Sequence, residues 1–261
     1  GRGTMTTDGP PTPAAWTSDD PGVTTADAWR EWLDSTDSPS ALDGVTGRIL
    51  VISAHPDDEV LGAGGLLHDA VAQGIGVTVL CLSDGAASHP GSPTVTPEAL
   101  AVIRRAELTT ALSALGVNCT IHHELPDGGL DRCGDAITEA IDAAVGSHGG
   151  HSSIVSVWRA DRHPDHEAVG HAASTVAARL GLALLEYPVW MWHWARPGDD
   201  AVPWARARRH RLSPAAVEAK KRAVHAFVSQ ITDLSDDPAD RAVLEPHVLD
   251  RLIGPTETFF S

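Results

Sequence analysis

The sequence predicts an α/β protein, a Rossmann-like three-layer α/β/α sandwich with a mainly parallel sheet. Two observations carry this prediction. Between residues 48 and 189, short runs of branched apolar residues alternate with amphipathic segments of helical periodicity. Such alternation places parallel strands in one sheet with helices over both faces. The 261 residues, 42% of them hydrophobic, are enough for the core of one such domain.

The N-terminal part, residues 1–45, is expected to be an arm with one short helix. Residues 5–24 are rich in Thr, Pro, Asp and Gly, a composition that buries little apolar surface. Residues 26–33 follow with Trp29 and Trp32 at a three-residue spacing, which favours a helix. A single globular domain is expected over residues 46–261.

This domain opens with a branched apolar run at 48–54, which is typical of a buried strand. The helix expected at 59–73 has an apolar stripe and ends at a glycine. A helix from 96 to 115 begins with Thr96 as cap and Pro97 at the first helical position. By the same signals, strands are expected at 77–82, 119–125, 154–158 and 182–189, and helices at 135–145 and 165–180.

Beyond residue 189 the pattern changes to a Trp-rich loop, residues 190–204. Trp190, Trp192 and Trp194 alternate, so an extended chain would place the three indoles on one face. A flat aromatic wall suits a sugar ring, and the three are candidate substrate contacts, with core packing an equal alternative. The remaining elements expected are an edge strand at 205–212, a C-terminal helix at 213–229 and a short helix at 240–244.

The composition narrows the possible partners. The formal net charge is -16, with 35 acidic and 19 basic residues, which argues against nucleic acid or an anionic membrane surface. No apolar run is long enough to span a bilayer, so no membrane partner is expected. Three cysteines without a C-x-x-C spacing, and no signal-peptide pattern, favour a reduced, cytoplasmic protein. The oligomeric state is left open.

Ionisable residues gather where two expected strands end. The first strand leads into His55, Asp57 and Asp58, and the fourth leads into His163 and His166. Because the carboxyl ends of parallel strands share one edge of the sheet, both groups are expected there. His55 and Asp58 are three residues apart, as are His163 and His166, a spacing that suits one face of a first helical turn. Two His and one Asp with an open position suit catalytic Zn²⁺, and Fe²⁺ is the alternative.

Four segments together resemble the PIG-L/LmbE family of metal-dependent N-deacetylases, over roughly residues 46–230. They are Ala54-His55-Pro56-Asp57-Asp58-Glu59, Arg104-Arg105-x-Glu107, His163-Pro164-Asp165-His166 and the late segment 220–230. The resemblance implies that the single domain is a deacetylase domain whose substrate is a small-molecule amino sugar.

The resemblance also implies a role for the main residues of the two histidine motifs. His55, Asp58 and His166 would be the zinc ligands. Asp57 would be the general base acting on the metal-bound water, although a carboxylate at that place is also a common helix N-cap. His163 would be protonated and would stabilise the oxyanion of the tetrahedral intermediate.

Residues around these motifs have weaker assignments. Asp165 is expected to orient a ligand imidazole as a hydrogen-bond acceptor, and Glu59 to serve as a charge at a helix N-terminus. Arg105 and His89 are candidate substrate contacts, with a solvated surface position as the ordinary alternative. Asp161 stands where some thiol-precursor deacetylases of the family have a tyrosine, which weakens assignment to that subgroup.

The function implied is zinc-dependent hydrolysis of the N-acyl amide of an N-acylglucosamine-type sugar. The narrower expectation is an antibiotic-biosynthesis enzyme acting on a teicoplanin-type glycopeptide, because the Trp-rich loop and the Gly/Pro-rich loop at 85–97 suit a bulky acceptor. The alternatives are a deacetylase or amidase of a glucosaminyl-inositol thiol precursor or conjugate, and a non-catalytic metal-binding module. A nucleotide-binding oxidoreductase is disfavoured because no G-x-G-x-x-G follows the first strand.

Overall fold

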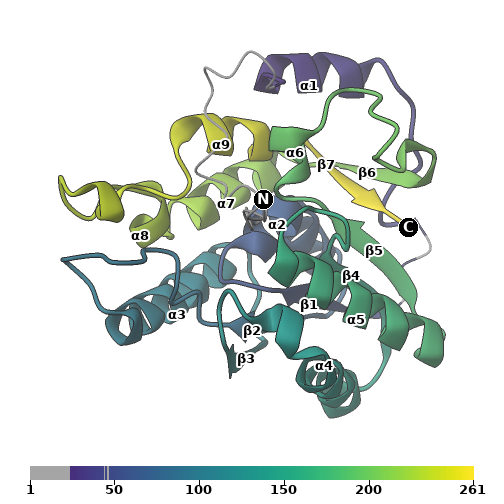
Figure 1. The fold of residues 1–261 in the computed structure, drawn as a ribbon. Helices are drawn as coiled ribbons and strands as arrows, with labels where there is room; N and C mark the ends of the chain where they lie inside the picture. Colours follow the sequence, from purple (N-terminus) through teal and green to yellow (C-terminus); the bar gives the residue numbers. More distant parts are fainter. Residues whose placement is uncertain (1–23, 44, 46) are drawn as a thin grey trace, which may run out of the picture.

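A computed structural model describes residues 24–43, 45 and 47–261, and Figure 1 shows their arrangement. One seven-stranded sheet in the order β3-β2-β1-β4-β5-β7-β6 runs through the molecule, with helices over both faces. The α/β sandwich with a mainly parallel sheet is therefore confirmed. Its five parallel strands are those expected from the apolar runs: β1 (Arg48–Ser53), β2 (Val77–Ser83), β3 (Thr120–Leu125), β4 (His151–Val157) and β5 (Ala183–Tyr187).

Helices cover both faces of the sheet, as the strand order requires. The helices of the described residues are α1 (Ala26–Asp34), α2 (Asp58–Ala72), α3 (Pro97–Ala114), α4 (Gly134–His148), α5 (Pro164–Leu180), α6 (Met191–Trp194), α7 (Pro214–Val224), α8 (Val228–Ile231) and α9 (Pro246–Leu252). Crossovers from β1 to β2 and from β2 to β3 step in one direction, so α2 and α3 cover one face, where α7 packs against both. The next two crossovers step the other way, and α4 and α5 cover the opposite face.

The strand order reverses between β1 and β4. Strand β1 pairs in parallel with β2 on one side and with β4 on the other. The chain therefore leaves these neighbouring strands in opposite directions, which opens a crevice at their carboxyl ends, the usual ligand site of such sheets. His55 follows β1 and His163 follows β4, so the topology brings both histidine motifs to this crevice.

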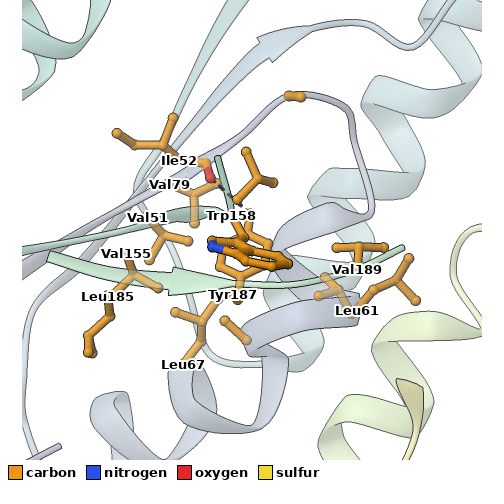
Figure 2. Packing of buried hydrophobic residues seen from close by; sticks show 14 of the residues in the cluster. Val51, Ile52, Leu61, Leu67, Val79, Val155, Trp158, Leu185, Tyr187 and Val189 are labelled. Carbon is orange, nitrogen blue, oxygen red and sulfur yellow. Dashed lines mark hydrogen bonds between the residues drawn. The ribbon is translucent and has the colours of Figure 1, made fainter. Parts of the chain in front are cut away.

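The central strands are buried because their side chains are apolar on both faces. Every residue of β2, and every residue of β1 except the first, is buried. Figure 2 shows the core around Tyr187, whose hydroxyl donates a hydrogen bond to the Ile52 carbonyl oxygen at 2.8 Å. Gly62 of α2 lies against this ring, because an added Cβ would come 2.0 Å from Tyr187 Cδ2. The close approach of α2 to the sheet depends on this glycine.

The antiparallel end of the sheet is only half predicted by the sequence. The expected edge strand is β6 (Ala207–Arg211), but a further strand, β7 (Thr256–Phe260), lies between β5 and β6. The sequence predicts no element beyond residue 244. Pairing with two neighbouring strands buries Phe259 and Phe260 completely, which stabilises the fold by about 1.5–3 kcal/mol for each side chain.

The C-terminal helices also differ from the prediction. The helix expected at 213–229 ends at Val224, and α8 begins separately at Val228 after a turn that buries Phe227. The helix expected at 240–244 is wrong, because Pro238–Asp240 form a 3-10 turn and the helix is α9. The Asp240 carboxylate accepts hydrogen bonds from three hydroxyl groups, those of Ser92, Thr94 and Ser235.

The Trp-rich loop is not extended. Residues Met191–Trp194 form the helical turn α6, so alternate side chains point about 200° apart and the shared face does not form. The Trp29 indole of α1 donates to the Trp192 carbonyl oxygen at 2.9 Å, with its ring edge-on to that of Trp192. The structure therefore places Trp190 and Trp192, both 7% exposed, in the core rather than along a substrate wall.

The N-terminal segment is described only from residue 24, so most of the expected arm lies outside the described residues. Helix α1 packs through Trp29 onto the same core as the sheet. Across the described parts of the chain, every helix is too short or too polar to cross a membrane.

Candidate metal centre and active site

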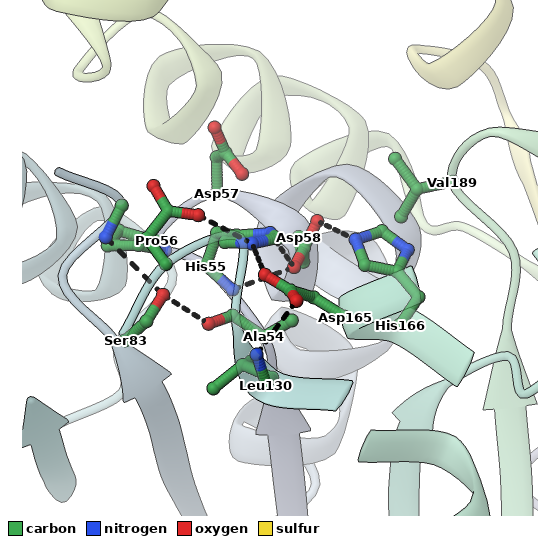
Figure 3. A network of polar contacts seen from close by, with 12 residues as sticks. Ala54, His55, Pro56, Asp57, Asp58, Ser83, Leu130, Asp165, His166 and Val189 are labelled. Atoms are coloured by element: carbon green, nitrogen blue, oxygen red, sulfur yellow. Dashed lines mark hydrogen bonds and ion pairs between the residues drawn. The ribbon is translucent and has the colours of Figure 1, made fainter. Parts of the chain in front are cut away.

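The turn between β1 and α2 carries His55 and Asp57. Its backbone is unusual at Asp57, whose φ of 125° lies in the region that favours glycine. The Asp57 carbonyl oxygen accepts the first helical bonds from Val60 and Leu61, but the side chain makes no capping bond. The N-cap alternative for this carboxylate is therefore not observed, and Figure 3 shows it pointing away from Asp58.

His55, Asp58 and His166 form a buried cluster of metal-type donors (Figure 3). One donor atom from each residue lies within 4.8 Å of the others. Asp58 is central, because its Oδ2 is 3.4 Å from His55 Nδ1 and its Oδ1 is 3.2 Å from His166 Nε2. The loop after β1 and the first turns of α2 and α5 thus bring the three expected ligands together.

The spacing of these donor atoms suits coordination of a divalent cation better than it suits hydrogen bonds among the three side chains. Donors about 2.0–2.2 Å from a tetrahedral ion lie about 3.3–3.6 Å apart, close to the separations found here. The His166 Nε2 atom is buried without a hydrogen-bond partner, because its approach to Asp58 lacks hydrogen-bond geometry. A buried nitrogen in this state calls for an explanation, and a bound cation provides one. The donor group has three members among the described residues, which suits a catalytic rather than a closed structural site.

The electrostatics of the cluster also favour a cation. Burial opposes ionisation of Asp58, but the imidazoles of His166 and His55 hold the pKa of that carboxyl well below its usual range. Burial likewise opposes the charge of His166, yet the carboxylates of Asp58 and Asp161 raise its pKa to about 9. An ionised carboxylate between two imidazoles is a place where a divalent cation can replace bound protons.

A carboxylate stands behind the His55 imidazole. His55 Nε2 lies 3.0 Å from Asp165 Oδ2, which is the orienting contact expected for Asp165. Asp165 also accepts backbone N–H groups of Gly128 and Leu130, so both of its oxygens are in use. His55, His163 and Asp165 form a second possible donor group. The existing contacts of Asp165 favour the group centred on Asp58 instead.

Two further carboxylates at this site are missed by the sequence analysis. Asp161, considered only as a position without a tyrosine, is fully buried, and its Oδ2 lies 2.8 Å from His166 Nδ1. Asp127, in the turn after β3, has Oδ1 at 3.1 Å from His55 Nε2 and accepts from the Ala87 N–H. The one signal in the sequence is that both residues closely follow an expected strand, at its carboxyl end.

The Asp57 carboxylate is held by Arg104 rather than by its neighbour Arg105. Arg104 is buried and donates to Asp57 Oδ2 and to the Gly85 carbonyl oxygen, each at 2.8 Å. Position 85 requires glycine, because φ is 64° and an added Cβ would lie 1.9 Å from Arg104 Nη1. Arg105, the expected substrate contact, is partly exposed and pairs with Asp84. The structure therefore brings Arg104 to the site and leaves Arg105 beside it.

Asp57 and His163 have pKa values suited to different tasks. Burial raises the pKa of Asp57 to about 7, while the charge of Arg104 acts against that rise. Burial, together with the charges of the His166 and His55 imidazoles, lowers the pKa of His163 to about 3. Their ring centroids lie 4.5 Å and 5.2 Å from that of His163. The lowered pKa favours a neutral His163 over the protonated ring expected from the resemblance, and a neutral imidazole can still donate one hydrogen bond.

Glu59 also differs from its expected role. Its side chain is fully buried, and neither carboxyl oxygen has a hydrogen-bond partner. Burial raises the pKa of Glu59 to about 8. The raised pKa favours the uncharged form, which argues against the expected role as a charge at the N-terminus of α2.

The remaining candidate contacts, His89 and Trp194, differ in exposure. His89 is 6% exposed and has its Nδ1 3.0 Å from Ser88 Oγ, and burial together with the charge of Arg104 lowers its pKa. Trp194 is half-buried, and the Arg162 guanidinium lies 3.7 Å from its ring centroid. Of the three candidate tryptophans, Trp194 keeps the most accessible ring.

A hollow of about 550 Å³ lies elsewhere, between the turn after α1 and strand β6. Asp34, Asp43 and Arg209 are among its lining residues, and no residue of the metal cluster lines it. The hollow and the candidate chemistry therefore occupy different places on the fold.

Comparison with known proteins relates the chain to deacetylases. Residues 50–177 match the PIG-L family, described as GlcNAc-PI de-N-acetylase. The 1D-myo-inositol 2-acetamido-2-deoxy-alpha-D-glucopyranoside deacetylase of Kineococcus radiotolerans is 29% identical over 195 residues, which are 63% of this chain and 51% of that protein. The uncharacterized deacetylase YaiS of Escherichia coli is 32% identical over 143 residues, which are 53% of this chain and 72% of that protein.

Solved structures share the fold. The zinc-inhibited form of teicoplanin deacetylase Orf2 has a TM-score of 0.64 at 21% identity, over 82% of this chain and 97% of that one. The A40926 pseudoaglycone deacetylase Dbv21 has a TM-score of 0.62 at 26% identity, over 82% and 96%. The chain spans about half, 51%, of the length of the Kineococcus relative. Its motifs, its fold and the Escherichia coli relative together show that the chain belongs to the PIG-L family of metal-dependent deacetylases.

Proposed function

We propose that this chain hydrolyses the N-acyl amide of an N-acylglucosamine-type sugar with the help of one divalent metal ion. The observation that carries this proposal is the position of Asp57 beside, but not within, a cluster of three donors. A structural metal site is usually closed by four protein ligands, whereas a hydrolytic site keeps one position open. A non-catalytic metal-binding module would leave the buried pair of Asp57 and Arg104 without a purpose.

His55, Asp58 and His166 would hold the ion. Zinc suits two imidazoles and one carboxylate, and ferrous iron is the alternative that the same donors allow. When bound, the ion would make water a nucleophile near neutral pH and would polarise the amide carbonyl. The buried, unpartnered Nε2 of His166 supports this assignment.

Asp57 is the proposed base. Arg104 fixes its Oδ2, which leaves Oδ1 to accept the proton of the attacking water. Because burial raises the pKa of Asp57 to about 7, the same carboxyl group can then donate that proton to the departing nitrogen. A group whose pKa lies near the working pH serves well as both acceptor and donor. This division of tasks does not require a protonated His163.

Neutral His163 is proposed to donate a hydrogen bond to the carbonyl oxygen as negative charge develops there. Its ring lies beside both cluster histidines, and its Nδ1 has no hydrogen-bond partner in the protein. The imidazole is therefore available to a substrate. One such donor contributes about 2.7–4 kcal/mol to stabilisation of the transition state.

The proposed substrate class is supported by the relatives. The Kineococcus relative is named as a deacetylase of an acetamido sugar linked to inositol. Dbv21 is named as a deacetylase of the pseudoaglycone of an antimicrobial compound. We therefore propose a natural product such as a teicoplanin-type glycopeptide as the first substrate to test. A glucosaminyl-inositol thiol precursor is the second candidate, favoured by the length of the Kineococcus match.

Release of acetate or fatty acid from a panel of compounds tests this proposal. The panel contains N-acetylglucosamine, an inositol-linked N-acetylglucosamine and a glycopeptide-linked N-acylglucosamine, each incubated with zinc-loaded protein. Asp57→Ala is the matched control, since it is expected to keep the metal and lose turnover. Failure to release acid from any amino sugar would refute the proposal, and activity on the inositol-linked compound alone would reverse the order of the two substrates.

A further inference from the structure

Asp161 joins two parts of the molecule at the crevice. It lies in the turn between β4 and α5 and is fully buried. Its Oδ2 lies 2.8 Å from His166 Nδ1 and accepts the backbone N–H groups of Val189 and Trp190, at 3.1 and 2.9 Å. Its Oδ1 accepts the N–H of Met191 at 2.8 Å. One carboxylate therefore binds both a cluster histidine and the turn that leads from β5 into α6.

These contacts decide which nitrogen of His166 faces the cluster. An ionised carboxylate only accepts hydrogen bonds, and here N–H groups already surround both of its oxygens. Nδ1 of His166 must therefore carry a hydrogen, and Nε2 is the atom that can offer a lone pair to a cation. Nε2 is also the buried atom that lies 3.2 Å from Asp58 Oδ1 without a hydrogen-bond partner.

We propose that Asp161 is a positioning residue, which holds His166 with Nε2 toward Asp58 and couples this ligand to the turn at 189–191. The inference rests on the proposed function only in requiring that the cluster binds a metal ion, and it does not depend on which amide is cleaved. Hydrogen-bond acceptors behind metal-binding histidines commonly change metal affinity by about 10- to 100-fold. Loss of the Asp161 carboxylate is expected to have an effect of that size.

A purely structural role for Asp161 is the competing explanation. Without this carboxylate, three N–H groups of the turn at 189–191 lose their acceptor, which lowers stability whatever happens to His166. Zinc affinity and the position of the hydrogen on His166 separate the two explanations. Trp194 offers a matched control, because its Nε1 donates to the Asp161 carbonyl oxygen at 3.1 Å. Trp194→Phe therefore perturbs the same junction and keeps the carboxylate.

The experiment measures the zinc dissociation constant by competition with a chromophoric chelator, under conditions where circular dichroism shows each variant to be folded. Asp161→Ala is expected to weaken zinc binding by about 10- to 100-fold, whereas Trp194→Phe lowers Tm and leaves the affinity at the wild-type value. The zinc affinity of Asp161→Asn is expected to fall between the affinities of these two variants. Its amide oxygen can take the place of Oδ2 and still accept from His166, but as a weaker, uncharged acceptor.

Nitrogen-15 NMR of the histidine rings gives a second readout, with His166 identified by the signal that His166→Gln removes. The zinc-loaded wild type is expected to carry its hydrogen on Nδ1, and Asp161→Ala to show exchange of that hydrogen with solvent. Wild-type zinc affinity in folded Asp161→Ala, or an equal loss in Trp194→Phe, would overturn the positioning role. Should Asp161→Ala fail to fold, unchanged zinc affinity in Asp161→Asn has the same consequence. A wild type that binds no zinc contradicts the proposed function itself.

Discussion

Replacing Arg104 by methionine is expected to move the pH dependence of amide hydrolysis. Arg104 donates to Asp57 Oδ2 at 2.8 Å, and the two side chains are only 3% and 10% exposed. An arginine beside a carboxylate commonly lowers the pKa of that carboxyl by about 1–3. Removing the charge should therefore raise the pKa of Asp57 from about 7 to about 8–10.

The size of the effect follows from the ionised fraction of Asp57, since only the carboxylate can accept a proton. At pH 7 this fraction is expected to fall from about one half to about 10%, or to about 0.1% at the upper limit of the shift. The value of kcat/KM at pH 7 should drop by about 5- to 500-fold. It should recover as the pH rises past the new pKa.

The assay measures kcat/KM of zinc-loaded protein between about pH 5 and about pH 10. Arg105→Met is the matched control, because this neighbour is 40% exposed in its side chain and pairs with Asp84 rather than Asp57. Its pH profile should match that of the wild type. A loss of rate in Arg104→Met that persists at high pH would refute the reasoning, because it would show that Arg104 acts other than through the ionisation of Asp57.

Three further predictions concern stability, measured by urea unfolding. Burial raises the pKa of Glu59 from 4.5 to about 8. The stabilisation of the fold by the protonated Glu59 side chain is therefore fully present below pH 4.5 and is lost as the pH rises through 8. Glu59→Gln should not show this loss, so by about pH 9 its free energy of unfolding should exceed that of the wild type by about 3–5 kcal/mol. An identical pH dependence of stability in the two proteins would contradict an uncharged buried carboxyl. Gly62→Ala would place a Cβ 2.0 Å from the Tyr187 ring and should cost about 1–3 kcal/mol of stability. Wild-type stability in this variant would show instead that α2 can shift away from the ring. Lys220→Met removes the cation whose Nζ lies 2.8 Å from the buried Glu257 carboxylate. It should cost about 3–5 kcal/mol of stability, and an unchanged stability would contradict a stabilising ion pair at this position.

The donor cluster could be predicted because its signals are local. Each histidine motif places its ligands just before or within the first turn of a helix that follows an apolar strand, so a few neighbouring residues define the geometry of each half. The five parallel strands were predictable for a similar reason, since runs without polar alternation indicate burial on both faces.

Strand β7 and helix α6 could not be predicted in this way. Phe259 and Phe260 are buried only because β7 pairs with β5 and β6, which are distant in the sequence. The Trp-rich segment alternates like a strand, but the Asp161 carboxylate captures the N–H groups at 189–191 and turns the chain into α6. In both cases a contact between remote segments outweighs the local pattern.

The local sequence determined that His55, Asp58 and His166 are the candidate metal donors and that they follow β1 and β4. It also determined that the Asp57 carboxylate adjoins them. Tertiary structure alone decided that Arg104 rather than Arg105 meets Asp57, and that Asp161 stands behind His166. It also decided that burial lowers the pKa of His163. The physical reason is that hydrogen-bond partners and pKa values depend on how closely remote segments approach and on how deeply they bury a group. The spacing of metal ligands within one motif, in contrast, depends on a few consecutive residues.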